Sequence, residues 1–111
     1  MTDAKSRILI IVDDPTMVSL VKKHLQKLNC EMVVAGEEGI LQKVFDEVPH
    51  LILIDEDFAG GAGVLIAQRI KEDAVLKYIP IILLVKKNAF LDRNFELIDA
   101  YCEKTVIAEK L

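Results

Sequence analysis

Apolar residues along the chain fall into short runs that predict β-strands. The runs at 7–12 and 51–54 show no polar alternation, which is typical of strands buried on both faces of a sheet. Weaker runs predict further strands at 31–35, 79–85 and 100–103. Pro80 falls near the start of its run, where a missing N–H costs a sheet least.

Between these runs, apolar residues recur at helical spacing. Pro15 stands where the first turn of a helix tolerates proline, and Met17, Val21 and Leu25 follow on one face. Similar patterns predict helices at 40–48 and 65–70, with a flexible turn at 59–63 before the second of these. A short helix at 90–98 and the start of a last helix at 106–111 complete the pattern.

Strands that alternate with helices predict an α/β fold. Right-handed crossovers place the helices on both faces of a parallel sheet, which gives a doubly wound architecture. The 111 residues fit a single domain spanning 1–111. In such open sheets ligands bind beyond the carboxyl ends of the strands, so candidate functional residues are sought there.

Composition excludes several classes of protein. The apolar fraction of 52% supports a real core, and the net charge of −4 argues against a nucleic-acid-binding face. The longest apolar stretch, 78–85, is far shorter than the ~20 residues of a membrane helix. No export signal begins the chain, and Cys30 and Cys102 match no paired redox or zinc spacing. We therefore expect a cytoplasmic protein with two buried thiols.

Charged residues gather where the predicted strands end. Asp13 and Asp14 follow the first strand, an acidic triplet begins at Asp55 after the third, and Lys86 and Lys104 follow the fourth and fifth. Converging carboxylates repel one another unless a cation is present, and oxygen ligands on a compact site favour Mg²⁺. Any single aspartate is alternatively explained as a helix cap, so only the acidic residues and lysines taken together indicate a binding site.

These residues belong to segments that resemble a known family. The segments are Ile8-Leu9-Ile10-Ile11-Val12-Asp13-Asp14-Pro15, Pro49-His50-Leu51-Ile52-Leu53-Ile54-Asp55, Gly63 at the start of a helix, Ile79-Pro80-Ile81-Ile82-Leu83-Leu84, and Tyr101 followed by Lys104. In this order and spacing, the chain resembles a response-regulator receiver domain of two-component signalling. The resemblance implies a flavodoxin-like sheet of five parallel strands in the order 2-1-3-4-5.

The resemblance also implies a role for individual residues. Asp55 matches the aspartate that accepts a phosphoryl group from a histidine kinase. Asp13 and Asp14 match the acidic pair that binds Mg²⁺, with Asp55 and the Asp57 main-chain carbonyl as further ligands. Lys104 matches the lysine that pairs with the phosphoryl oxygens. Tyr101 matches the aromatic residue that changes rotamer on activation.

Two positions depart from the family pattern in the predicted switch. Val85 stands where the family has threonine or serine, and valine cannot donate the hydrogen bond that this hydroxyl gives to the phosphoryl group. Lys86 stands where the family has a small residue. Its side chain either caps the phosphoryl site, neutralises the acidic cluster, or is simply a solvated loop lysine.

The register of the acidic pair leaves two alternatives. An alignment anchored on Pro15 without a gap places Val12 at the first acidic position and Asp13 at the direct metal ligand. A one-residue deletion before Pro15 instead makes Asp14 the direct ligand. Because side chains along a strand alternate between faces, the two alignments aim different residues into the pocket.

The C-terminal part of the chain is shorter than the family pattern. The segment between Val85 and Lys104 lacks a few residues, Thr105 replaces the proline that follows the lysine, and the chain stops at Leu111. We expect the fifth helix to be short or missing and the domain to be cut from a longer protein. The shortened segment before Lys104 and the short or missing fifth helix both fall on the face that receivers commonly use for dimerisation, so a homodimer is one expectation.

Two functional hypotheses follow. The first is a receiver domain that accepts a phosphoryl group on Asp55 with Mg²⁺, from a histidine kinase or phosphotransfer protein, and switches an output domain or effector protein. The second is a degenerate receiver that acts as a phosphorylation-independent interaction module. Neither is an ordinary enzyme, because the first catalyses at most its own phosphorylation and dephosphorylation. A flavodoxin-like enzyme or nucleotide binder would need a glycine-rich phosphate loop, which the chain lacks.

Overall fold

The computed structural model describes residues 5–86 and 98–104 as a single sheet flanked by helices. The strands are β1 (Ser6–Ile11), β2 (Cys30–Val34), β3 (Leu51–Asp55), β4 (Ile81–Val85) and β5 (Ala100–Glu103). The helices are α1 (Pro15–Leu25), α2 (Ile40–Glu47), α3 (Phe58–Gly61), α4 (Gly63–Glu72) and the short 3₁₀ helix η1 (Leu76–Tyr78).

The sheet has the predicted topology. Its strand order is β2-β1-β3-β4-β5, and every neighbouring pair is parallel. This confirms the doubly wound, flavodoxin-like fold expected from the sequence. The five predicted strands agree with the observed ones to within two residues, and the run at 100–103 coincides with β5.

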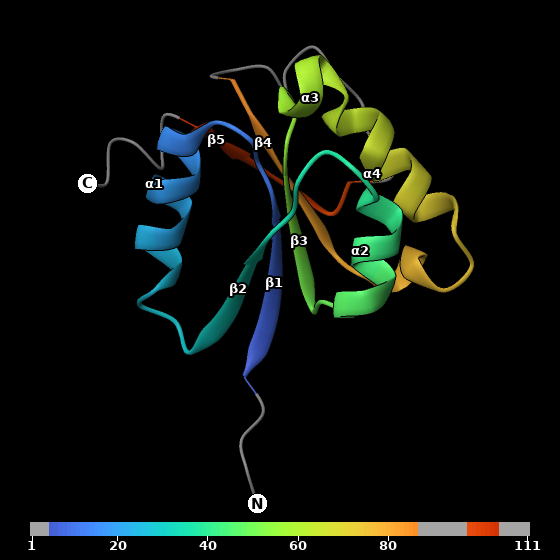
Figure 1. The fold of residues 1–111 in the computed structure, drawn as a ribbon, viewed down its shortest axis with the longest axis horizontal. Helices are drawn as coiled ribbons and strands as arrows, with labels where there is room; N and C mark the ends of the chain where they lie inside the picture. The colour runs from blue at the N-terminus through green and yellow to red at the C-terminus, as the bar shows by residue number, and fades with distance from the viewer. Residues whose placement is uncertain (1–4, 87–97, 105–111) are drawn as a thin grey trace, which may run out of the picture.

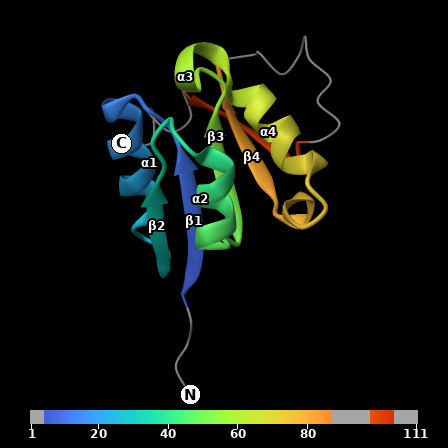
Figure 2. The same ribbon diagram turned by 45° about the vertical axis from the view of Figure 1, so that its right-hand side comes forward.

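Helices cover the sheet on both sides. Figure 1 shows α1 on one side and α2 and α4 on the other, and Figure 2 shows the same layers turned by 45°. Alternate strand residues feed two apolar clusters, as period-2 geometry requires. One cluster joins Ile10 and Leu53 to α1, and the other joins Leu9 and Ile54 to α2 and α4.

The turn predicted at 59–63 is partly helical. Phe58–Gly61 forms the short α3, in which Ala59 and Gly60 are not regular helical residues, since their φ values are 51° and 72°. Small residues at these positions permit the left-handed backbone that turns the chain from β3 into α4. The predicted helices at 90–98 and 106–111, and the question of a short or missing fifth helix, lie outside the described residues, apart from Ile98, which is not helical.

Lys71 ties the far end of α4 to the sheet. Its Nζ donates to the carbonyl oxygens of Ile79 at 2.8 Å and Lys77 at 3.1 Å, and lies 2.9 Å from Asp99 Oδ2. The same carboxylate oxygen accepts a hydrogen bond from the Ile81 amide at 2.8 Å. One side chain therefore connects α4, η1, the start of β4 and the residue before β5.

Two further sequence predictions concern the thiols and the membrane. Cys30 and Cys102 form no disulfide, and both are half-buried rather than fully buried as expected, because β2 and β5 are the edge strands of the sheet. None of the helices in the described ranges has both the length and the apolar character needed to cross a bilayer.

Candidate functional site

Asp55 occupies the carboxyl end of the central strand β3. Its main chain pairs with Leu84 of β4, and its side chain is 3% exposed. The Oδ1 atom accepts a hydrogen bond from the Asp57 amide at 2.9 Å. The end of a buried strand, followed at once by a turn, therefore holds the carboxylate in a fixed direction at the edge of the sheet.

Lys104 reaches this carboxylate from the end of β5. Its Nζ lies 2.6 Å from Asp55 Oδ1 and 2.7 Å from Asp57 Oδ2, and its side chain is 20% exposed. Burial lowers the pKa of Lys104, but hydrogen bonds to Asp55 and Asp57 and the charges of both carboxylates outweigh it, so the net pKa is raised above 10.5. The lysine is a firmly held cation between two carboxylates.

The acidic residues after β1 point elsewhere. Asp13 Oδ2 accepts a hydrogen bond from the Ala59 amide at 2.9 Å, which ties the end of β1 to α3. Asp14 is the N-cap of α1, and its Oδ1 accepts from the Thr16 amide at 3.0 Å. Val12 is 1% exposed and packs in the apolar cluster beneath α1. Continuing the β1–β3 register by one residue places Val12, not an acid, opposite Asp55.

The residues predicted to bind Mg²⁺ all make contacts within the protein. Each predicted Mg²⁺ ligand is already engaged: Asp55 by Lys104, Asp13 by Ala59 and Asp14 by Thr16. The Asp57 carbonyl oxygen accepts from the Gly61 amide at 3.2 Å. Within residues 5–86 and 98–104, no three His, Cys, Asp or Glu side chains are grouped for a metal. Positive charge beside Asp55 comes from Lys104.

The predicted switch positions lie on the last two strands. Val85 is fully buried in the cluster beneath α2 and α4, and it pairs with Glu103. The Lys86 side chain is exposed, while its amide donates to Glu56 Oε2 at 2.8 Å. Tyr101 is half-buried, pairs with Leu83 and packs against the same cluster as Val85. Valine at position 85 therefore gives β4 an apolar end and no hydroxyl.

Glu56 and Gly63 contribute in ways that the sequence did not indicate. Glu56 is only 6% exposed, and its hydrogen bond to the Lys86 amide links the ends of β3 and β4. An acid in a loop after a strand is ordinarily solvated, so no signal marked its burial. Gly63 was expected only to open a helix, but its amide also donates to the Glu56 carbonyl oxygen at 3.3 Å.

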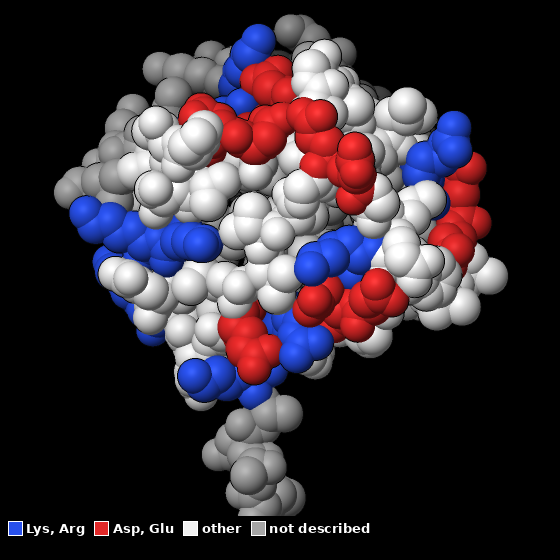
Figure 3. Space-filling model, viewed as in Figure 1, with Lys and Arg blue, Asp and Glu red and all other residues white. Residues whose placement is uncertain are grey.

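The site lies in an acidic region of the surface. Figure 3 shows acidic side chains gathered along the upper part of the view, where Figure 1 places the carboxyl ends of the strands. Such a field disfavours the approach of a polyanion and favours that of a cationic partner surface.

Comparisons with known proteins agree with this fold. No family model matches the chain. The transcriptional regulatory protein TrcR of Mycobacterium tuberculosis is 30% identical in an alignment that covers 95% of this chain and 42% of TrcR. The chain thus spans less than half the length of that curated relative.

Solved structures resemble the chain over almost all of its length. A response regulator described as putative, from Chloroflexus aurantiacus, superposes with a TM-score of 0.81 at 20% identity, covering 96% of this chain and 94% of that one. The phosphorylated cyanobacterial phytochrome response regulator RcpA superposes with a TM-score of 0.73 at 19% identity, covering 96% and 91%. The chain has the fold of a response-regulator receiver domain, which confirms at the level of the fold the resemblance drawn from its sequence.

Proposed function

We propose that this chain is a phospho-accepting receiver domain of two-component signalling, in which Asp55 receives a phosphoryl group. The observation that carries the proposal is the Lys104 ammonium group, 2.6 Å from Asp55 Oδ1 at the carboxyl end of β3. A buried carboxylate beside a fixed cation suits a group that must carry additional negative charge. The similar structure of RcpA, which is described as phosphorylated, supports the same chemistry.

The two oxygens of Asp55 differ in their readiness to react. Oδ1 accepts from both Asp57 and Lys104, whereas Oδ2 has no hydrogen-bond partner among the described residues. Because no fully buried side-chain oxygen or nitrogen in those ranges lacks a partner, Oδ2 is the oxygen that solvent reaches. We infer that Oδ2 is the nucleophile, with its lone pairs unengaged.

Transfer forms one bond and breaks another. Oδ2 attacks the phosphorus of a donor phosphohistidine, the N–P bond breaks, and the imidazole nitrogen keeps the electron pair. The product is an acyl phosphate on Asp55. Lys104 neutralises charge on the phosphoryl oxygens, and to do so its Nζ leaves one of the two carboxylates that it contacts in this structure.

The proposed function requires a phosphoryl donor, a recipient of the signal and a metal ion. The donor is a histidine kinase or phosphotransfer protein, and the response passes to an output domain or effector protein in the cytoplasm. The similarity to TrcR, a transcriptional regulatory protein of which the chain covers 42%, supports an output domain outside this chain. Mg²⁺ is proposed as the cofactor, although its ligands must first release the contacts described above.

A second candidate is a degenerate receiver that binds its partner without phosphorylation. The observation in its favour is that the side chains of Asp13, Asp14 and Asp57 all contact other groups of the protein. The buried Val85, which offers no hydroxyl to a phosphoryl group, points in the same direction.

Intact-mass spectrometry after incubation with acetyl phosphate and Mg²⁺ separates the two candidates. We expect one added phosphoryl group in the wild type and none in Asp55→Asn, which keeps the shape of the side chain. Asp57→Asn is the matched control, because it changes a neighbouring carboxylate that the proposal does not make a nucleophile. A folded wild-type protein that gains no mass would favour the degenerate receiver.

A further inference from the structure

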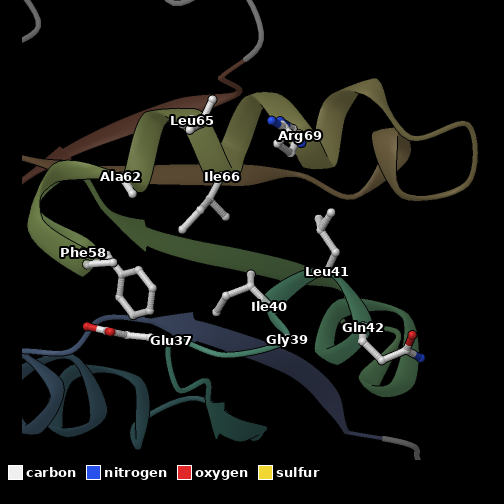
Figure 4. A pocket seen from close by; sticks show the side chains of 11 residues that line it. Glu37, Gly39, Ile40, Leu41, Gln42, Phe58, Ala62, Leu65, Ile66 and Arg69 are labelled. Carbon is white, nitrogen blue, oxygen red and sulfur yellow. The ribbon is translucent and has the colours of Figure 1, made fainter.

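A second concave surface lies away from Asp55, between α2, α3 and α4. It is a pocket of about 470 Å³ with an apolar floor that includes Ile40, Phe58 and Ile66 (Figure 4). Leu41 on α2 and Leu65 on α4 also line it, and they are 39% and 53% exposed. Large aliphatic side chains at the edge of an apolar hollow favour contact with another apolar surface.

The two ends of this pocket carry opposite charges. Figure 4 shows Glu37 at the end where Phe58 and Ala62 lie, and Arg69 at the other end, along α4. Both side chains are exposed, and neither forms an ion pair or hydrogen bond with any residue that the structure describes. An apolar surface with an unpaired anion at one end and an unpaired cation at the other is complementary to itself after a half-turn.

We propose that this pocket is a contact surface between two copies of the chain, related by a two-fold axis near Leu65 and Ile66. Ala62 and Arg69 are equally far from this point along α4, at about 5 Å each way with a rise of ~1.5 Å per residue. With the two α4 helices antiparallel, Arg69 of one copy therefore lies opposite Ala62 of the other. That end of the pocket is where Glu37 lies.

The same arrangement buries the exposed apolar side chains. Leu65 of each copy faces the pocket of the other, and the small side chain of Ala62 leaves room for the arriving helix. The interface is centred on one pocket and is small beside the ~1,600 Å² of a standard stable complex. The dimer is therefore weak and depends on concentration. It involves none of the residues proposed for phosphoryl transfer, so it holds or fails independently of that function.

Sedimentation velocity of charge-reversal variants tests this arrangement. In a homodimer, Glu37→Arg places two cations together at both ends, and Arg69→Glu places two anions together at both ends. Each variant alone should associate at least about tenfold more weakly than the wild type, since both pairs change from attraction to repulsion. An equimolar mixture of the two variants should associate as well as the wild type, because every contact then joins opposite charges.

Lys22→Glu on α1 is the matched control, because it reverses a charge on the opposite side of the sheet. It should leave association unchanged. Leu65→Asn should weaken it without unfolding the protein, since this side chain is half exposed. The proposal is overturned if the wild type stays monomeric at the highest soluble concentration. It is also overturned if the single reversals associate normally, or if their mixture does not recover the wild-type behaviour.

Discussion

Gly63 lies directly against the main-chain carbonyl of Asp55. A Cβ atom at position 63 would overlap the Asp55 carbonyl oxygen and come within 2.7 Å of Glu56 Cα. The start of α4 therefore packs on the backbone at Asp55 and Glu56, and the absence of a side chain at position 63 makes this packing possible.

Gly63→Ala should accordingly destabilise the protein. The methyl group meets backbone atoms that cannot rotate away, so we expect a loss of about 1–3 kcal/mol in the free energy of unfolding, the usual cost of overpacking. Urea denaturation measures it. Gly36→Ala is the control, because a Cβ there meets nothing within 4 Å. Equal stability of the two variants would show that α4 does not pack as described.

The ion pairs of Lys104 should make stability depend on pH at the alkaline end. Its pKa is raised in the folded protein above 10.5. Its contribution is therefore complete below that value and is lost as the pH rises through the folded pKa. Lys104→Met should be less stable than the wild type near about pH 8, and the difference should shrink towards about pH 11. A difference that stays constant across this range would contradict the ion-pair assignment.

Substitutions of Asp13 and Asp14 should affect different properties of the protein. Asp14 caps α1, so Asp14→Ala should lower the free energy of unfolding by about 1 kcal/mol. Asp13→Asn keeps an oxygen that can accept from Ala59, so stability should change little while Mg²⁺ affinity falls. Calorimetric titration with Mg²⁺, beside urea denaturation, measures both. If Asp14→Ala lowers the Mg²⁺ affinity and Asp13→Asn does not, Asp14 is the direct ligand. A wild type that binds no Mg²⁺ would remove the cofactor from the proposal.

Replacing Val48 by glycine should increase the stability of the protein. It ends α2 with a φ of 45°, a conformation that a β-branched side chain disfavours, and it is 69% exposed. Val48→Gly should stabilise the protein by about 1 kcal/mol, the strain relieved less the entropy that glycine loses. Val75→Gly is the control, since Val75 is similarly exposed but has a φ of −94°. Thermal denaturation of both variants should therefore show shifts of opposite sign.

The sequence predicted the sheet well because burial on both faces leaves a strong local pattern. The uninterrupted apolar run from Leu51 to Ile54 was enough to predict β3. Asp55, which ends this run, marked the edge of the sheet where Lys104 contacts it. The partners of individual acids could not be predicted. Asp13 turns to the Ala59 amide, 46 residues away, and this contact exists only once the backbone between β3 and α4 has its left-handed turn.

The contacts of Lys71 extend beyond the helix that carries it. Its ammonium group holds two main-chain carbonyls around η1 and the carboxylate of Asp99, which in turn accepts the first amide of β4. An edge strand such as β5 is ordinarily the first to fray. Here Asp99, the residue before β5, cannot move away without depriving Lys71 of its counter-charge, and the Lys71 side chain is only 10% exposed. Amide protons of η1 and the start of β4 should consequently exchange with solvent in one cooperative opening.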